Sequence, residues 1–125
     1  SKITDASNIS ALGGVCELNL RGIYMITDVS GLGHVHILNL SKCYGISDVS
    51  ALGNVHTLNL SRCYRLSDKS NISALSNVYN LDLSWCNRIT NISALSGVQT
   101  LILYFCRRIN NVSGLYNVHI DYEID

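Results

Sequence analysis

The cysteines offer the first residues whose chemistry can be tested from spacing. Four of the five, Cys43, Cys63, Cys86 and Cys106, recur at intervals of 20, 23 and 20 residues. Four thiolates could hold zinc only if they converged on one point at about 2.3 Å. A column with one cysteine per repeat, spaced at roughly 4.8 Å, puts its ends about 14 Å apart. We therefore expect small buried side chains at a turn, and no metal site.

The same recurrence bears on the redox state of the thiols. A regular interval marks a position in a repeat and not a disulfide partner. Thiols that stay reduced indicate an intracellular compartment. A second column, Cys16, His36 and His56, has Glu17 beside it. A metal or Cys–His catalytic site there would need contact geometry and an orienting third group, so we expect exposed column residues instead.

Large aromatic and basic side chains gather in the C-terminal half. Trp85, Tyr104 and Phe105 interrupt columns that hold Ser41, Ser61, Lys42 and Arg62 in earlier repeats, and Arg65, Arg88, Arg107 and Arg108 adjoin them. Aromatic and arginine side chains are the usual anchors of interfaces. Local packing against the last strand is an equally open interpretation. The candidate partner-binding residues are Trp85, Ile102, Tyr104, Phe105, Arg88, Arg107 and Asp82.

The elements that position these residues follow from an internal repeat. A Leu-x-Leu pair recurs with spacings of 20, 20, 23 and 20, and a valine lies three residues ahead of each pair. The pairs are Leu18/Leu20, Leu38/Leu40, Leu58/Leu60, Leu81/Leu83 and Leu101/Leu103. Each unit closes with a V/I-S-A/G-L stretch. One such coil cannot bury enough apolar surface alone, so neighbouring coils must stack.

Within each unit the pattern predicts a short strand and a return. Leucines that alternate with polar residues have the period of a strand. The stretch I-S-D-V-S-A-L, as in 46–52, is too short for an ordinary helix and predicts a turn or one 3₁₀ turn. The unit from Leu66 to Leu75 carries three extra residues, which we expect to bulge into solvent.

The wording L-x-x-L-x-L-x-x-C/N resembles leucine-rich repeats (LRRs), with valine in place of the first leucine. The C-x-x-I-[TS]-[DN] stretch is similar to their cysteine-containing subclass. The near-identical V-H-T-L-N-L-S-x-C-Y wording resembles arrays in uncharacterised proteins of large DNA viruses and protists, which implies a viral protein in the host cytoplasm. The resemblance implies a β-rich solenoid of the α/β class. It would be a right-handed coil with one parallel sheet on the concave face and turns or 3₁₀ segments on the convex face.

We expect one solenoid domain over residues 1–125. Its predicted parts are a partial repeat at 1–14, full repeats at 15–34, 35–54, 55–77, 78–97 and 98–117, and a capping strand at 118–125. The segment Ile3–Leu12 would cover the first coil.

The last strand has two possible registers. By simple repetition Asp121 and Glu123 fall where leucines belong. Either these carboxylates point inward and discourage further stacking, or the strand slips by one residue. The slip would turn Ile120, Tyr122 and Ile124 towards the core. We favour the slip because burying charge is costly.

The composition narrows the function classes. The net charge is zero, which argues against nucleic acid, and no apolar run is long enough to span a bilayer. The LRR resemblance implies non-enzymatic protein binding through the strand face. The alternative is a structural or self-assembling array, a piece of a longer protein that associates through its ends. A carbohydrate-active enzyme using Asp82, Asp121 and Glu123 is the third hypothesis; no nucleophile elbow, phosphate loop, metal spacing or cofactor motif supports it.

Overall fold

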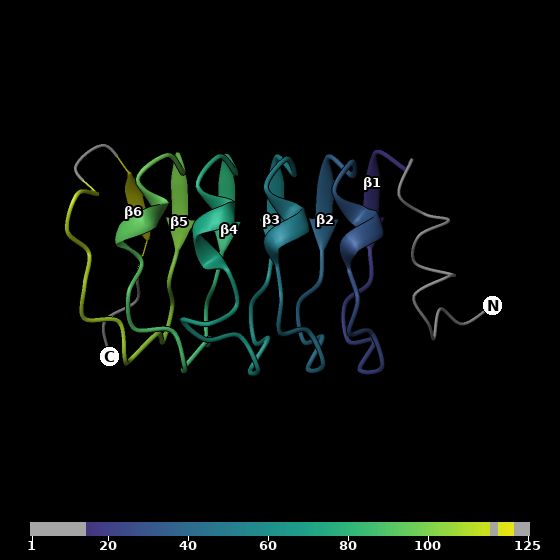
Figure 1. Ribbon diagram of the computed structural model, residues 1–125, viewed down its shortest axis with the longest axis horizontal. Helices are drawn as coiled ribbons and strands as arrows, with labels where there is room; N and C mark the ends of the chain where they lie inside the picture. The colour runs from purple at the N-terminus through teal and green to yellow at the C-terminus, as the bar shows by residue number, and fades with distance from the viewer. Residues whose placement is uncertain (1–14, 116–117, 122–125) are drawn as a thin grey trace.

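The computed structural model describes residues 15–115 and 118–121. In this part of the chain six short strands form one parallel sheet in the order β1-β2-β3-β4-β5-β6 (Figure 1). Each coil contributes one strand, because a stretch of about twenty residues returns the chain to the start of the next coil. The strands are β1 Glu17–Asn19, β2 Ile37–Asn39, β3 Thr57–Asn59, β4 Asn80–Asp82, β5 Thr100–Ile102 and β6 His119–Asp121.

The register of the sheet follows the leucines. The central leucine of each strand is paired with that of the next, as in Leu38 with Leu58 and Leu58 with Leu81. Because side chains alternate along a strand, these leucines point into the coil, while residues such as Asn59 and Asp82 lie on the opposite face. The predicted one-parallel-sheet solenoid is confirmed.

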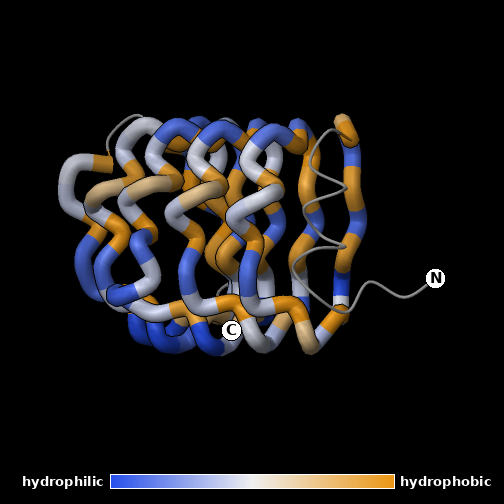
Figure 2. The backbone as a smooth tube through the Cα atoms, turned by 45° about the vertical axis from the view of Figure 1, so that its right-hand side comes forward, coloured by the Kyte–Doolittle hydropathy of each residue, from blue (hydrophilic) through white to orange (hydrophobic). Residues whose placement is uncertain are grey.

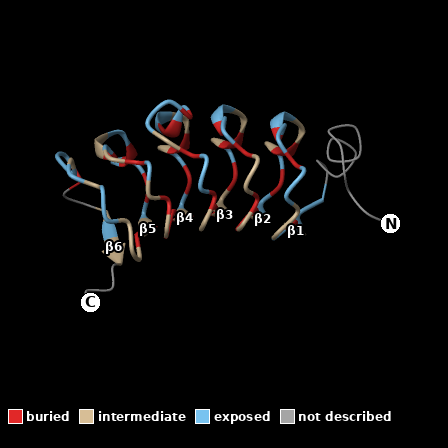
Figure 3. Cartoon of the chain, turned by 90° about the horizontal axis from the view of Figure 1, so that it is seen from below, coloured by how far each residue is buried: buried red, intermediate tan, exposed pale blue. Residues whose placement is uncertain are grey.

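The return segments form single 3₁₀ turns at the stretches where a turn or 3₁₀ turn was predicted. They are η1 Ser30–Leu32, η2 Ser50–Leu52, η3 Ile72–Leu75 and η4 Ser93–Leu95. Seen from below the view of Figure 1, the strands line the inner side of a shallow arc and the 3₁₀ turns line its outer side (Figure 3). No helix in the described part of the chain could cross a membrane.

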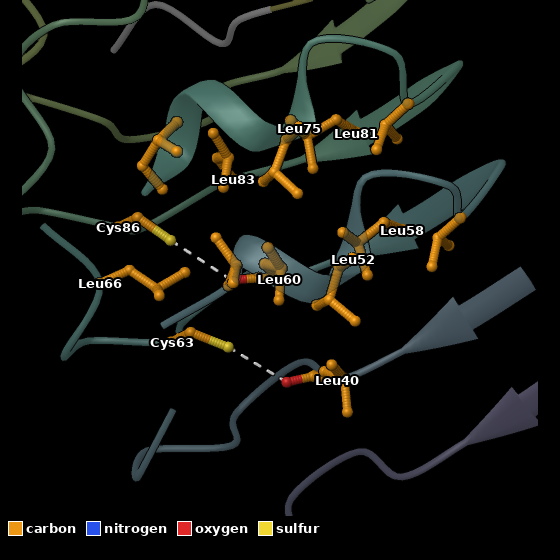
Figure 4. Packing of buried hydrophobic residues seen from close by; sticks show 14 of the residues in the cluster. Leu40, Leu52, Leu58, Leu60, Cys63, Leu66, Leu75, Leu81, Leu83 and Cys86 are labelled. Atoms are coloured by element: carbon orange, nitrogen blue, oxygen red, sulfur yellow. Dashed lines mark hydrogen bonds between the residues drawn. The ribbon is translucent and has the colours of Figure 1, made fainter. Parts of the chain in front are cut away.

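The core lies between the sheet and the 3₁₀ turns. Apolar residues at equivalent positions of successive coils form rows that run along the stack. Leu58, Leu60 and Leu66 of one coil are at most 1% exposed. Figure 4 shows these leucines packed beside Leu81 and Leu83 of the next coil, with the thiols of Cys63 and Cys86 pointing at the main chain of the coil before. Each coil is therefore sealed by its neighbours.

The three-residue insertion differs in part from the expected solvent bulge. Asp68 and Lys69 are exposed, but Ser70 is 2% exposed. The Ser70 carbonyl accepts a hydrogen bond from the Val49 N–H at 3.1 Å, and its hydroxyl oxygen accepts one from the Ser67 N–H at 3.0 Å. The insertion is fastened to the preceding coil because its buried polar groups need partners.

The last strand has the slipped register. Ile120 is paired with Leu101 and packs against the core, and Asp121 is paired with Ile102 on the other face. The slip avoids placing the Asp121 carboxylate among leucines. The predictions for Ile3–Leu12 and for Tyr122, Glu123 and Ile124 lie outside the described residues.

Candidate functional site

A column of five residues lies in the turns that follow β1 to β5. It comprises Gly22, Lys42, Arg62, Trp85 and Phe105, and we call it the turn column. All five have a positive φ, from 58° at Lys42 to 77° at Gly22. A left-handed conformation costs a residue with a side chain about 1–2 kcal/mol. The backbone of these turns therefore favours glycine, yet four successive coils place a large side chain there.

The turns are held in register by the main chain. The N–H of Lys42 donates to the carbonyl of Ser61 at 2.9 Å, and the N–H of Arg62 donates to that of Ser84 at 2.8 Å. The N–H of Trp85 donates in the same way to Tyr104 at 2.9 Å. These main-chain bonds therefore align the residues of the turn column, one per coil along the stack.

The C-terminal members of the turn column stack on each other. The rings of Trp85 and Phe105 have centroids 4.4 Å apart and planes inclined by 24°. The guanidinium carbon of Arg62 lies 5.1 Å from the Trp85 ring centroid, within range of a cation–π interaction. All three side chains are partly exposed. The arrangement is a pre-formed ladder of one cation and two rings open to solvent on one side.

Tyr104 has a different role from Trp85 and Phe105. Its hydroxyl donates to Asp121 Oδ2 at 2.9 Å, and its N–H donates to the Ser84 hydroxyl oxygen at 3.0 Å. The N–H of Ser84 in turn donates to Asp82 Oδ1 at 2.9 Å. Tyr104 thus ties the turn after β5 to β6, which is the local packing role left open by the sequence.

The remaining candidate residues lie on two surfaces. Ile102 is partly exposed on β5, between Asp82 and Asp121 in the register of the sheet. Arg88 and Arg107 are exposed and lie beyond Cys86 and Cys106, on the far side of the turns from the strands. Trp85 and Phe105 lie in the turns and not on the strands themselves. The cluster expected around the strand face is therefore centred on the edge of that face.

The cysteine column is structural. The thiols of Cys43, Cys63, Cys86 and Cys106 donate to leucine carbonyls of an earlier coil at 3.0–3.3 Å. Burial raises the pKa of Cys63 to about 12 and that of Cys86 well above its usual value. All five cysteines of the chain are unpaired thiols in this structure, and no group of three metal-ligating side chains occurs among residues 15–115 and 118–121.

The histidine column forms an aromatic stack. The rings of His36 and His56 have centroids 4.6 Å apart, and His56 stacks on Tyr79 at 4.8 Å. Cys16 is exposed. Tyr79 takes the same position one coil later, which the sequence interpretation overlooked although the repeat aligns it with His56. The arrangement is that of packed column residues at the edge of the sheet.

Two other columns are a row of tyrosines and a row of asparagines. Tyr24, Tyr44 and Tyr64 stack with ring centroids 4.8 Å and 5.4 Å apart. The asparagines bond to the turns that follow their own strands. Asn39 Oδ1 accepts from the N–H and the hydroxyl of Ser41, and Asn59 Oδ1 from the N–H of Ser61. Asparagine prefers the backbone two residues ahead, so each one fixes its own turn.

The carboxylates considered for catalysis are engaged elsewhere. Asp82 accepts from the Ser84 N–H and Asp121 from the Tyr104 hydroxyl. Ile102 separates them in the register, and Glu123 lies outside the described residues.

Sequence reasoning missed three residues of the site. Arg62 had been noted only as the ordinary occupant of its column, and Ser84 and Asp121 were not linked to Tyr104. The repeat could have predicted the role of Arg62, since Arg62 and Trp85 occupy the same position in adjacent coils. No spacing rule predicts the Tyr104–Asp121 contact, because it depends on the slip of β6.

Comparison with solved structures identifies the architecture. Internalin C2 from Listeria monocytogenes is similar with a TM-score of 0.55 and 22% identity, over 98% of this chain and 67% of that one. A second internalin of the same organism, inlF, is similar with a TM-score of 0.55 and 18% identity, over 99% of this chain and 47% of that one. Internalins are LRR proteins, so the fold is an LRR solenoid. No family model matches the sequence, and no curated protein matches it.

Proposed function

We propose that this LRR solenoid is a non-enzymatic scaffold that binds a protein partner. The proposed surface is the strand face of β4 and β5 with its C-terminal edge, where Trp85, Ile102 and Phe105 lie. Arg88 and Arg107 extend it beyond the turns, and Asp82 contributes a carboxylate on the strand side. The internalin likeness supports the fold alone, so the proposal depends on the site.

The observation that carries the proposal is the Trp85–Phe105 stack at 4.4 Å, capped by Arg62 at 5.1 Å. Trp85 and Phe105 are partly exposed although both side chains are large and aromatic. Exposed aromatic anchors beside arginines are characteristic of interfaces. Because the rings already stack in the unbound chain, ordering them for a partner would cost little side-chain entropy.

Local packing alone accounts poorly for this pair. Tyr104 already fastens β5 to β6 through Asp121, so the end of the sheet does not need the rings of Trp85 and Phe105. Both rings also lie on backbone that favours glycine. Residues held in strained backbone conformations are typical of functional positions.

The test is a pull-down with the whole chain as bait, comparing it with the double variant Trp85→Ser and Phe105→Ser. The proposal expects a reproducibly captured protein to be lost from the variant while thermal unfolding stays within a few degrees. The matched control is His56→Ser with Tyr79→Ser, which removes a stacked pair of similar size from the opposite edge of the strands. Capture that survives in the first variant, or that disappears equally in both, would refute the proposed surface.

We also propose that the protein works in a reducing compartment. The support is that the cysteine thiols serve as hydrogen-bond donors to the main chain, a role that oxidation would end. The more specific proposal of a host cytoplasm depends on the resemblance of the repeat sequence to viral arrays. Mass spectrometry of the protein isolated without reductant tests the first point, because alkylation only after unfolding should label all five cysteines.

A further inference from the structure

The charges of this neutral chain are separated in space. The chain has nine basic and nine acidic residues. We call the segments 21–25, 41–45, 61–65, 84–88 and 104–108 the post-strand edge. None of these segments contains Asp or Glu. The post-strand edge holds seven of the nine basic residues, namely Arg21, Lys42, Arg62, Arg65, Arg88, Arg107 and Arg108.

The fold brings the five segments of the post-strand edge together. Each follows a strand of the same parallel sheet, and main-chain hydrogen bonds such as Lys42 N–H to Ser61 O hold successive segments in register. In Figure 1 they form the lower edge of the molecule, and Figure 2 shows hydrophilic stretches along that edge on the side away from the N-terminal label. Lys42 and Arg62 occupy the same position on adjacent coils, and so do Arg65, Arg88 and Arg108. Their main chains lie about 5 Å apart along the stack, and like charges carried at this spacing repel each other.

We infer that the post-strand edge binds an acidic segment of the protein partner. This inference rests on the proposed protein-binding function and names the chemistry of its partner. Arginine guanidinium groups bind carboxylates through paired hydrogen bonds. Arg65 and Arg88 are exposed, and the Arg21 guanidinium is oriented by a 3.0 Å bond to the Ser41 hydroxyl. Tyrosine hydroxyls on the same edge supply further donors.

The aromatic rings on this edge favour a peptide over a nucleic acid. Non-specific single-strand binding depends on bases stacking on open ring faces. Here the rings stack on each other, at 4.8 Å for Tyr24 and Tyr44 and 4.4 Å for Trp85 and Phe105. Neighbouring rings therefore cover at least one face of each of these side chains, which reduces the surface on which bases could stack.

The size of the edge sets the length of the bound segment. Four steps between the five coils span about 19 Å at roughly 4.8 Å each. An extended peptide rises about 3.3 Å per residue, so about six residues cover that distance. The conformational cost supports a role for the whole edge, because Lys42 also keeps left-handed backbone two coils before Trp85.

Fluorescein-labelled decaglutamate is the probe for this inference, and the measurement is fluorescence anisotropy with the full chain at low ionic strength. We expect saturable binding that weakens as salt is added. The variant Arg65→Gln, Arg88→Gln and Arg108→Gln removes one cation from each of three coils. It should weaken binding about tenfold or more. No binding by the unaltered chain would overturn the inference.

The matched control changes the net charge equally on the opposite edge. His34, Asn54 and Asn77 are exposed after the 3₁₀ turns, and their replacement by glutamate also lowers the charge by three. Decaglutamate binding should fall at most slightly in this control; an equal fall in both variants would mean that only net charge matters and would overturn the inference. So would tighter binding of oligouridylate than of decaglutamate.

A competition experiment separates this inference from the proposed function. Decaglutamate should displace the partner captured in the pull-down. A captured partner that depends on Trp85 and Phe105 but resists decaglutamate would sink the acidic-segment inference alone. If decaglutamate binds but no protein depends on the Trp85–Phe105 stack, the proposed surface fails instead.

Discussion

In the turn column, residues with large side chains adopt a backbone conformation that favours glycine. Gly22 has the residue type that suits a φ of 77°, whereas Lys42, Arg62, Trp85 and Phe105 accept φ values of 58–64°. The repeat needs the turn for its geometry, and glycine would provide it at no steric cost. The large side chains are therefore best explained by what they present to solvent.

At Lys42 this explanation predicts that glycine is the more stable residue. Lys42→Gly should leave the free energy of unfolding unchanged or raise it by up to about 1 kcal/mol, because relief of the left-handed strain offsets the added freedom of the unfolded chain. Urea unfolding measures the difference. Lys69→Gly is the control, since Lys69 is exposed and not among the positive-φ residues, and it should lower stability. Equal losses at both positions would contradict the account.

The buried thiols predict a loss of stability in alkali. Burial raises the pKa of Cys63 to about 12, whereas the thiol of an unfolded chain ionises near 8.5. Because the folded pKa is the higher one, its contribution is complete below about pH 8.5 and falls as pH rises towards 12. Urea midpoints should drop over this range, and Cys63→Ala should reduce the slope.

Cys16→Ala is the control for the alkaline experiment, because Cys16 is exposed and lies outside the buried column. It should leave the slope unchanged. A slope that is the same in the parent chain and in Cys63→Ala would show that this thiol ionises freely in the folded state.

At the scale of elements, side-chain oxygens fix the outer turns. Asp48 Oδ1 accepts from the Ser50 N–H at 2.9 Å at the start of η2 and from Asn71 Nδ2 at 3.1 Å. Asp68 accepts from the side chain and N–H of Thr90 and from the N–H of Asn91 in the next coil. These carboxylates join neighbouring coils on the outer side, much as the thiols do inside.

Acid should weaken the hydrogen bonds by which Asp68 connects its coil to the next one. Slight burial raises the pKa of this carboxyl, but hydrogen bonds from Thr90 and Asn91 outweigh it and leave the pKa below its usual value. Since the folded pKa is the lower one, the contribution is complete above about pH 4 and is lost as pH falls through the folded pKa. Melting temperatures between about pH 5 and pH 2 should fall more steeply for the parent chain than for Asp68→Asn. Identical slopes would contradict this role.

The elements themselves were predictable because the repeat is explicit. Leu-x-Leu pairs set the strands, V-S-A-L stretches set the 3₁₀ turns, and the cost of burying Asp121 set the register of β6. The bonds of Asn39 and Asn59 could not be read from the repeat, because they run along the chain to Ser41 and Ser61 and not across the sheet. Gly22 is consistent with a left-handed turn, but the other four residues of the turn column are not glycine, so the sequence does not predict that conformation.

At the scale of the molecule, stability comes from each coil sealing the next. Leu58 lies in a central strand paired on both sides and is 1% exposed, whereas Leu18 in β1 is only partly buried. Leu58→Ala should therefore cost about 2–5 kcal/mol, and Leu18→Ala distinctly less. Chemical denaturation of the two variants checks this. Equal costs would mean that the coils do not share one core.

The distribution of charge over the molecule could not be read from the composition. A net charge of zero argued against nucleic acid, yet the fold collects seven cations on the post-strand edge and leaves carboxylates such as Asp48 and Asp68 on the outer turns. Only the stacking of coils turns a column in the sequence into a surface. The sequence therefore predicts Trp85, Phe105, Arg88 and Arg107 as candidate binding residues, but it does not predict the chemistry of a partner.

The most direct test of the central claim is an NMR titration of the labelled chain with decaglutamate. The claim is that binding takes place at the turns that follow the strands. It predicts shifts that concentrate at the Trp85 indole N–H and at the amides of Lys42, Arg62 and Arg88, while Ile37 and Thr57 on the strands move little. Shifts confined to the strand face or to the 3₁₀ turns, with the Trp85 indole unmoved, would contradict it.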